Sequence, residues 1–175
     1  MYSYSKISNF YEYLEYGPHK NEDETKKYLE SLIKRCEEGS HNGDAVYWGI
    51  IDKTENILIG TIGLVGIKND ELSACSTMGL STEYRDKGRA LEAMISLLEF
   101  GFNKMSLKRI WSLTNVNNKA VIMSHKLFGF KEEKELKEYY LIKDKYANAK
   151  LLACLKEDFT CKKAITTIAL SRLLK

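Results

Sequence analysis

Residues 82–94, TEYRDKGRALEAM, combine three cations with a glycine at the point where a predicted strand gives way to a predicted helix. The residues concerned are Arg85, Lys87, Gly88, Arg89 and Ala90. The first N–H groups of a helix have no partner within the helix, and the helix dipole adds a partial positive charge there. Gly88 lets the backbone come close to a ligand, and Ala90 leaves room beside it. This pattern predicts a binding site for an anion such as a phosphate.

The same six residues, in the order Arg-x-x-Gly-x-Ala, are also typical of a solvated basic loop that caps a helix. A pattern this short occurs by chance in roughly one chain in ten of this length. The loop alone therefore leaves both interpretations open, and the neighbouring segments have to decide between them.

Two further polar residues belong to a short helix predicted over residues 118–128. Asn118 opens this helix, and His125 shares one of its faces with Val121 and Ile122, so we expect the imidazole to point toward the sheet. An imidazole whose pKa is near ~6.5 can donate a proton at neutral pH. A histidine that only forms part of the wall of a pocket fits the pattern equally well.

No side chain stands out as a general base. The strand predicted over residues 71–80 places Ser73, Cys75 and Thr77 on one face, without an acid in its interior. We therefore favour deprotonation through water, and a lone thiol such as Cys75 is more typical of packing than of a nucleophile. His19 lies in a polar stretch and is expected to face water.

These residues have to be positioned by a fold that mixes helices and strands. Apolar periodicity predicts helices over residues 21–38, 90–105, 118–128 and 160–175. Strands are predicted over residues 45–52, 57–67, 71–80 and 109–115, with two more inside residues 139–155. The first two strands are joined by the polar KTEN and should form a hairpin. The order lacks regular parallel crossovers, which indicates a mixed sheet flanked by helices.

Composition describes one ordinary globular domain. The chain has 175 residues, a net charge of +3 and a pI of about 8.5. A nucleic-acid-binding surface usually shows a pI above ~9 with clustered cations, so we expect no nucleic-acid partner. The four cysteines show neither a C-x-x-C pair nor zinc-like spacing, so no metal site is expected. The sequence has no run of ~20 apolar residues and no signal peptide, which predicts a cytoplasmic protein without a membrane contact.

Several segments together resemble the GNAT acetyltransferases. The Arg-x-x-Gly-x-Ala pattern resembles that family's pyrophosphate loop, and YRDKGRALEA, residues 84–93, is similar to the longer signature of its RimJ/RimL branch. Residues 107–118, LKRIWSLTNVNN, resemble the strand that follows in that branch. Residues 118–130 reproduce its Asn-x(10)-Gly-Phe helix and turn, and residues 13–32 resemble its substrate-side segment.

The resemblance implies a GNAT-like, mostly antiparallel sheet and the transfer of an acetyl group from acetyl-CoA to a primary amine by direct attack. It implies that the coenzyme is bound by Leu80, Arg85, Lys87, Gly88, Arg89, Ala90 and Asn118. In this family the asparagine that opens the short helix holds the pantetheine arm. Seven residues later, many members place a tyrosine that protonates the departing thiolate. His125 takes that position here.

The acceptor is left open by the sequence. The RimJ/RimL branch suggests the N-terminal amine of a protein, whereas residues 143–159 look more like members that act on a nucleotide-linked amino sugar. A different class of function, a non-catalytic module that binds coenzyme A with the same fold, is the alternative.

The two ends of the chain depart from the family pattern. Only ~10 residues precede the substrate-side segment, so the fold is expected to be shortened there, with residues 2–7 as an alternating edge strand. Residues 160–175 continue past the last expected strand as a helix with an apolar stripe. We therefore divide the chain into an acetyltransferase domain, residues 1–159, and an extension, residues 160–175. We expect the extension to pack on the same domain or on a second subunit in a homodimer.

Overall fold

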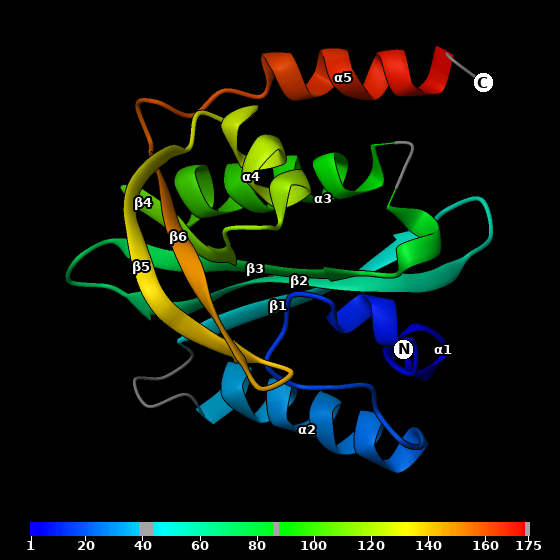
Figure 1. Ribbon diagram of the computed structural model, residues 1–175. Coiled ribbons are helices and arrows are strands. Elements are labelled where there is room, and N and C mark those ends of the chain that lie inside the picture. Colours follow the sequence, from blue (N-terminus) through cyan, green and yellow to red (C-terminus); the bar gives the residue numbers. More distant parts are fainter. Residues whose placement is uncertain (39–43, 86–87, 174–175) are drawn as a thin grey trace.

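The computed structural model describes residues 1–38, 44–85 and 88–173 and centres on a six-stranded sheet (Figure 1). The strands are β1 (Ala45–Asp52), β2 (Ile57–Lys68), β3 (Ser73–Leu80), β4 (Arg109–Asn115), β5 (Lys131–Ile142) and β6 (Lys145–Leu155). They lie in the order β1-β2-β3-β4-β6-β5, and every neighbouring pair is antiparallel except β3 and β4. The predicted sheet, mixed and mostly antiparallel, is confirmed.

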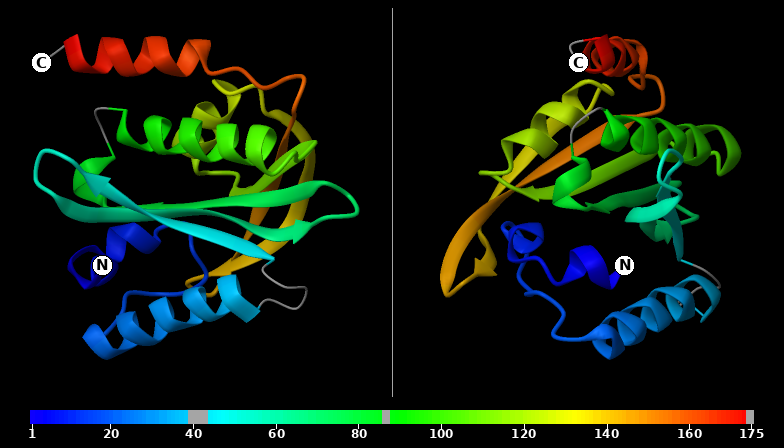
Figure 2. Two further views of the ribbon diagram at one scale, coloured as in Figure 1. Left: turned by 180° about the vertical axis from the view of Figure 1, so that it is seen from behind. Right: turned by 90° about the vertical axis from the view of Figure 1, so that its right-hand side faces the viewer.

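Helices cover both faces of this sheet. They are α1 (Tyr2–Ser5), η1 (Ser8–Tyr11), α2 (Glu22–Glu38), η2 (Thr82–Tyr84), α3 (Arg89–Glu99), η3 (Phe100–Lys104), α4 (Lys119–Lys126) and α5 (Lys162–Leu173). Figures 1 and 2 show α3 and α4 on one face, α5 outside these two helices, and α1 with α2 on the opposite face. Within the described ranges, no helix is long and apolar enough to cross a membrane.

The hairpin of β1 and β2 forms as predicted, through a polar turn. Asp52 ends β1, and its Oδ1 accepts the backbone N–H groups of Thr54 at 2.9 Å and Glu55 at 3.1 Å. Asn56 then adopts a φ of 53°, a left-handed conformation that asparagine tolerates better than most residues. Local turn chemistry is therefore enough to fix this part of the sheet.

The start of α2 is fixed by reciprocal hydrogen bonds. Asn21 Oδ1 accepts the N–H of Glu24 at 3.0 Å, and Glu24 Oε2 accepts the N–H of Lys20 at 2.7 Å. These bonds satisfy backbone donors that a helix start otherwise leaves unpaired. The helix then packs beside α1 and β1 and closes the lower face of the sheet in Figure 1.

The N-terminal segment differs from the prediction. Residues 2–5 form the short helix α1, and η1 follows, where an edge strand over residues 2–7 was expected. Tyr4 and Ser5 are both buried, at 2% and 1% exposure. An edge strand points successive side chains to opposite faces, so it cannot bury two neighbours against one surface. Burial against α2, where Ser5 Oγ meets Thr25 Oγ1 at 3.2 Å, overrides the alternating pattern.

β5 begins well before the predicted position at residue 139. Its first residues, KEEKELKE, are charged and exposed apart from the half-buried Leu136, so they show no apolar alternation. The strand is held by pairs across it: Lys150 Nζ lies 2.7 Å from Glu132 Oε2, and Asn148 Nδ2 donates to Glu135 Oε1 at 2.7 Å. Charged side chains on an edge strand also discourage pairing with other chains.

α5 contacts α3 through a narrow stripe. Ala164 is fully buried and Ile168 is 7% exposed, and Arg172 Nη2 lies 2.7 Å from Glu92 Oε1. Ile165 and Leu170, which are each 53% exposed, face away from the sheet. Ala164 and Ile168 are therefore the apolar residues that hold this helix against the domain.

Candidate functional site

The central feature of the site is an opening between β3 and β4. β3 has eight residues and β4 has seven, but they pair only at Ser73↔Arg109, Ala74↔Ile110 and Cys75↔Trp111. The Ser76 hydroxyl still donates to the Trp111 carbonyl at 3.3 Å, and beyond that point the ladder between the strands ends. Backbone polar groups along an interrupted ladder need other partners. An extended ligand with amide groups can supply them.

The predicted coenzyme-binding residues that the structure describes lie at or after the C-terminal ends of β3 and β4. Since β3 and β4 are parallel, their C-terminal ends lie at the same edge of the sheet. Leu80 is the last residue of β3 and leads into η2 and α3, whereas Asn115 ends β4 and leads into α4. Both helix starts are therefore brought to one place from segments far apart in the sequence.

Asn118 caps α4. Its Oδ1 accepts the N–H of Val121 at 3.4 Å, and its own N–H donates to the Asn115 carbonyl at 2.9 Å. Asn115 is 4% exposed, and its Oδ1 accepts the N–H of Asn117 at 2.8 Å. This chain of bonds fixes the turn that carries Asn118 to the edge of the opening.

Gly88 is required by the backbone and by its neighbour on α5. Its φ is 75°, in the left-handed region that favours glycine. A Cβ at this position would lie 2.8 Å from Ile168 Cγ1 and 3.2 Å from Ile168 Cα. The side of Gly88 that lacks a side chain therefore faces α5. Replacing Gly88 by a larger residue would disturb α5 together with any bound ligand.

Arg85 and Arg89, the two loop cations that the structure describes, have partners within the protein. Arg89 Nε lies 2.5 Å from Asp52 Oδ2, and its guanidinium lies over the ring of Tyr84 with 5.1 Å to the centroid. The pKa of Asp52 is lowered, first by this hydrogen bond. Arg85 Nε donates to the Leu80 carbonyl at 3.3 Å. Lys87 lies outside the described residues.

His125 is buried, 3% exposed, on the face of α4 that was expected to meet the sheet. Its Nδ1 lies 2.8 Å from the Val121 carbonyl, and its ring meets Phe130 edge-on with centroids 4.6 Å apart. A carbonyl only accepts, so Nδ1 carries the proton and Nε2 carries a lone pair. Among the described residues, buried Nε2 has no hydrogen-bond partner. Desolvation lowers the pKa of His125, although the bond to Val121 opposes this.

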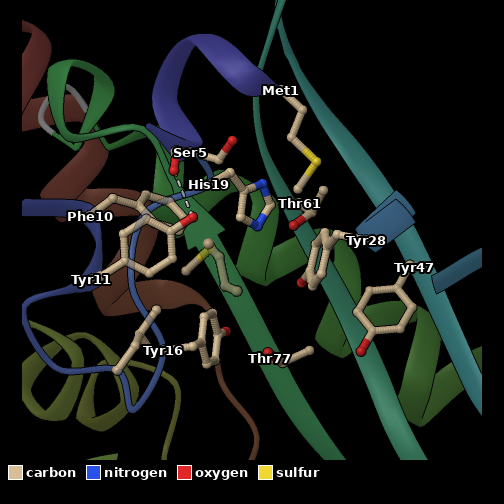
Figure 3. A pocket seen from close by; sticks show the side chains of 13 residues that line it. Met1, Ser5, Phe10, Tyr11, Tyr16, His19, Tyr28, Tyr47, Thr61 and Thr77 are labelled. Carbon is tan, nitrogen blue, oxygen red and sulfur yellow. Dashed lines mark hydrogen bonds between the residues drawn. The ribbon is translucent and has the colours of Figure 1, made fainter. Parts of the chain in front are cut away.

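An aromatic cavity of about 80 Å³ lies on the other face of β3 (Figure 3). Six rings from the N-terminal segment, α2 and β1 line it: Phe10, Tyr11, Tyr16, His19, Tyr28 and Tyr47. Thr77 and Gly79 of β3 also line it, and they belong to the part of β3 that has separated from β4. The cavity therefore lies over β1, β2 and the unpaired end of β3, on the face opposite α3.

His19 belongs to this cavity, so the expectation that it faces water is wrong. Its Nδ1 lies 2.8 Å from Thr25 Oγ1, and its ring lies between those of Tyr11 and Tyr28, at 6.3 and 5.5 Å. The aromatic lining as a whole was missed from the sequence. A signal existed, because five of the chain's 11 tyrosines occur within its first 16 residues.

Comparisons with known proteins agree with this architecture. Residues 2–131 match the family model described as an acetyltransferase (GNAT) domain. The chain is 27% identical over 128 residues to the uncharacterized N-acetyltransferase p20 of Bacillus licheniformis, which covers 73% of this chain and 72% of that protein. It is 29% identical over 90 residues to the spermidine N(1)-acetyltransferase of Escherichia coli strain K12, which covers 51% and 48%.

A solved structure shares the fold. The spermidine N-acetyltransferase of Vibrio cholerae, in complex with CoA and spermine, superimposes with a TM-score of 0.75. The match covers 90% of this chain and 88% of that one at 22% sequence identity. At that identity the likeness establishes the arrangement of helices and strands.

Proposed function

Because the chain belongs to the GNAT acetyltransferase family, and is thus an N-acetyltransferase that uses acetyl-CoA, we propose where the coenzyme and the acceptor bind. The pantetheine arm lies in the opening between β3 and β4, and the acceptor amine reaches the thioester from the aromatic cavity. The observation that carries this proposal is that the β3–β4 ladder ends after three pairs, while Thr77, Met78 and Gly79, which lie beyond that end of the ladder, line the cavity.

The phosphates of the coenzyme bind at the N-terminus of α3, mainly through backbone N–H groups. The helix dipole at the start of α3 and the N–H groups of a first helical turn, which have no partner within the helix itself, support this position. Arg89 is engaged by Asp52 and Arg85 by the Leu80 carbonyl, so their charges contribute less directly than the sequence pattern suggests. Leu80, Gly88 and Ala90 complete the rim of this site.

Asn118 holds the coenzyme arm from the edge of the opening, through side-chain and backbone groups of the α4 cap. His125 borders the thioester with a neutral ring. Its lowered pKa and its tautomer favour the role of a wall or a hydrogen-bond acceptor over that of a proton donor. Water then supplies the proton to the departing thiolate.

The acceptor is a small-molecule amine. The size of the cavity supports this choice over the N-terminus of a folded protein, which the RimJ/RimL-like signature in residues 84–93 would suggest. The extension beyond residue 159 packs on its own domain, and a homodimer is retained as an assembly to be tested by molar mass. A cytoplasmic location is supported by the four free cysteines, which suit a reducing compartment.

The decisive experiment measures the release of free CoA thiol from acetyl-CoA in the presence of a panel of amines, together with calorimetric titration of acetyl-CoA. We expect binding at one site and thiol release that depends on the amine. Binding without release for any amine would support the non-catalytic coenzyme A module instead. Absence of binding would contradict the site.

A further inference from the structure

Resting on the proposed function, we infer that the acceptor is a small primary monoamine with a compact, uncharged and mainly apolar body. The inference departs from the polyamines named for two of the relatives above. It depends on the chemistry and size of the aromatic cavity, and on how that cavity meets β3.

One wall of the cavity packs tightly on the part of β3 that no longer pairs with β4. Phe10 packs directly on Gly79: a Cβ at Gly79 would lie 2.8 Å from Phe10 Cζ. Tyr11 donates its hydroxyl hydrogen to the Ser5 carbonyl at 2.8 Å, which fixes the ring against the N-terminal segment (Figure 3). The N-terminal segment therefore forms a fixed wall, so the acceptor has to fit between it and the strands.

Among the described residues, the lining carries no anionic group at neutral pH that could pair with a second ammonium. Burial raises the pKa of Tyr11 to about 12, and burial also raises the pKa values of Tyr28 and Tyr47. Their hydroxyls therefore stay protonated. In the part of the chain that the structure describes, no Asp or Glu lines the cavity.

The nearby acids on the same segment are turned to other partners. Glu15 Oε1 accepts the N–H of Leu141 at 3.2 Å, and Glu24 Oε2 accepts the N–H of Lys20. Glu12 is exposed and lies close enough to Tyr13 and Arg85 to affect their pKa values. These carboxylates are placed to hold the N-terminal segment in position.

A polyamine is poorly matched to such a lining. When one of its amines is neutral and attacks, its other ammonium groups remain charged, and buried ammonium groups need carboxylate partners. The faces of tyrosine rings attract a cation only weakly compared with a carboxylate. A monoamine has no second charge to desolvate, so its body gains by entering the cavity.

The volume of the cavity limits the size of the apolar body that the acceptor amine can have. An apolar cavity of about 150 Å³ accommodates benzene. The cavity here measures about 80 Å³, which suits a short or branched alkyl group. Tyr16, 56% exposed, is the lining residue best placed to move for a larger group.

The reaction balances without a further reactant. The neutral amine nitrogen forms a bond to the acetyl carbon, and the bond from that carbon to the coenzyme sulfur breaks. The amine gives up one proton to water, and the thiolate takes one proton from water.

The test compares isobutylamine, phenethylamine and spermidine as acceptors in the thiol-release assay, with acetyl-CoA saturating. We expect kcat/KM for isobutylamine to exceed that for spermidine by at least about tenfold, with phenethylamine between them. A higher value for spermidine would overturn the inference and leave the acetyltransferase site intact. If none of these amines and no amine of the wider panel causes thiol release, the proposed function itself is contradicted.

A second experiment places a negative charge in the cavity and compares the same amines. Thr61→Asp puts a carboxylate on β2 facing the lining, and Thr54→Asp puts the same group in the exposed β1–β2 turn. We expect only Thr61→Asp to shift the ratio of spermidine to isobutylamine kcat/KM, by roughly tenfold toward spermidine. Equal ratios in the two variants, with both melting as cooperatively as the wild type, would overturn the inference. If Thr61→Asp does not fold, the ranking of amines by the wild-type protein decides alone.

Discussion

Burial and one hydrogen bond determine what the His125 ring can do. The lowered folded-state pKa means that the unfolded chain binds a proton on this residue at a pH where the folded chain does not. Its contribution to stability is therefore present above the unfolded value of ~6.5 and is lost as the pH falls from there toward the folded value, with a slope of up to about 1.4 kcal/mol per pH unit. We expect His125→Phe, which keeps an aromatic ring beside Phe130, to flatten this dependence. Urea unfolding between pH 7.5 and 5.5 checks it, and an unchanged slope would contradict it.

The same His125→Phe variant tests the role of the ring in turnover. A general acid is typically worth about 10²–10⁴-fold in rate. We expect kcat to fall by less than about threefold, because the neutral ring has no proton at Nε2 to give. A loss of a hundredfold with normal acetyl-CoA affinity would restore the general-acid assignment, since an acid acts only as the thiolate forms.

Ala90, in the first turn of α3, tests the anion site without the left-handed φ that makes a substitution at Gly88 strained. A carboxylate in the first turn of α3 would repel a phosphate bound at the positive end of the helix dipole. We expect Ala90→Glu to raise the Kd for acetyl-CoA by at least about tenfold. Ala169→Glu, on the exposed side of α5, serves as the matched control and should leave the Kd nearly unchanged. Equal affinities for the two variants would place the phosphates elsewhere.

Among the elements, α5 is held by few residues, which makes its energetics easy to isolate. Ile168 is 7% exposed and packs on Gly88, whereas Ile165 is 53% exposed on the same helix. We expect Ile168→Ala to lower the free energy of unfolding by about 2 kcal/mol and Ile165→Ala by less than about 0.5 kcal/mol. Chemical denaturation of both variants measures the difference, and equal losses would mean that α5 does not dock as described.

Elements whose signals are local could be predicted from the sequence. The β1–β2 hairpin rests on Asp52 and its turn, and α2 rests on Asn21 and Glu24, so both appear where the pattern indicates. The first half of β5 could not be predicted in this way, because its paired residues on β6 lie 13 (Leu136↔Ala149) to 22 (Lys131↔Ala153) residues away. The strand predicted over residues 2–7 was wrong for a similar reason, because contact with α2 decides the conformation of these residues.

At the scale of the whole molecule, the site also combines parts with a local sequence signal and parts that only tertiary contacts create. The loop that we propose to bind phosphates and Asn118 carry short patterns, so their places after β3 and β4 could be anticipated. The aromatic cavity gathers rings from the N-terminal segment, α2 and β1, and no spacing along the chain records that they meet. The partners of Arg85 and Arg89 likewise depend on tertiary contacts that a linear pattern does not contain.

The contact between Ile168 and Gly88 joins the start of α3 to the final helix. A Cβ at Gly88 would lie 2.8 Å from Ile168 Cγ1, so the backbone at the mouth of α3 and the side chain at residue 168 share one packed contact. A change of side chain on α5 at this position is therefore transmitted directly to the turn that opens α3, although the two residues are far apart in the sequence.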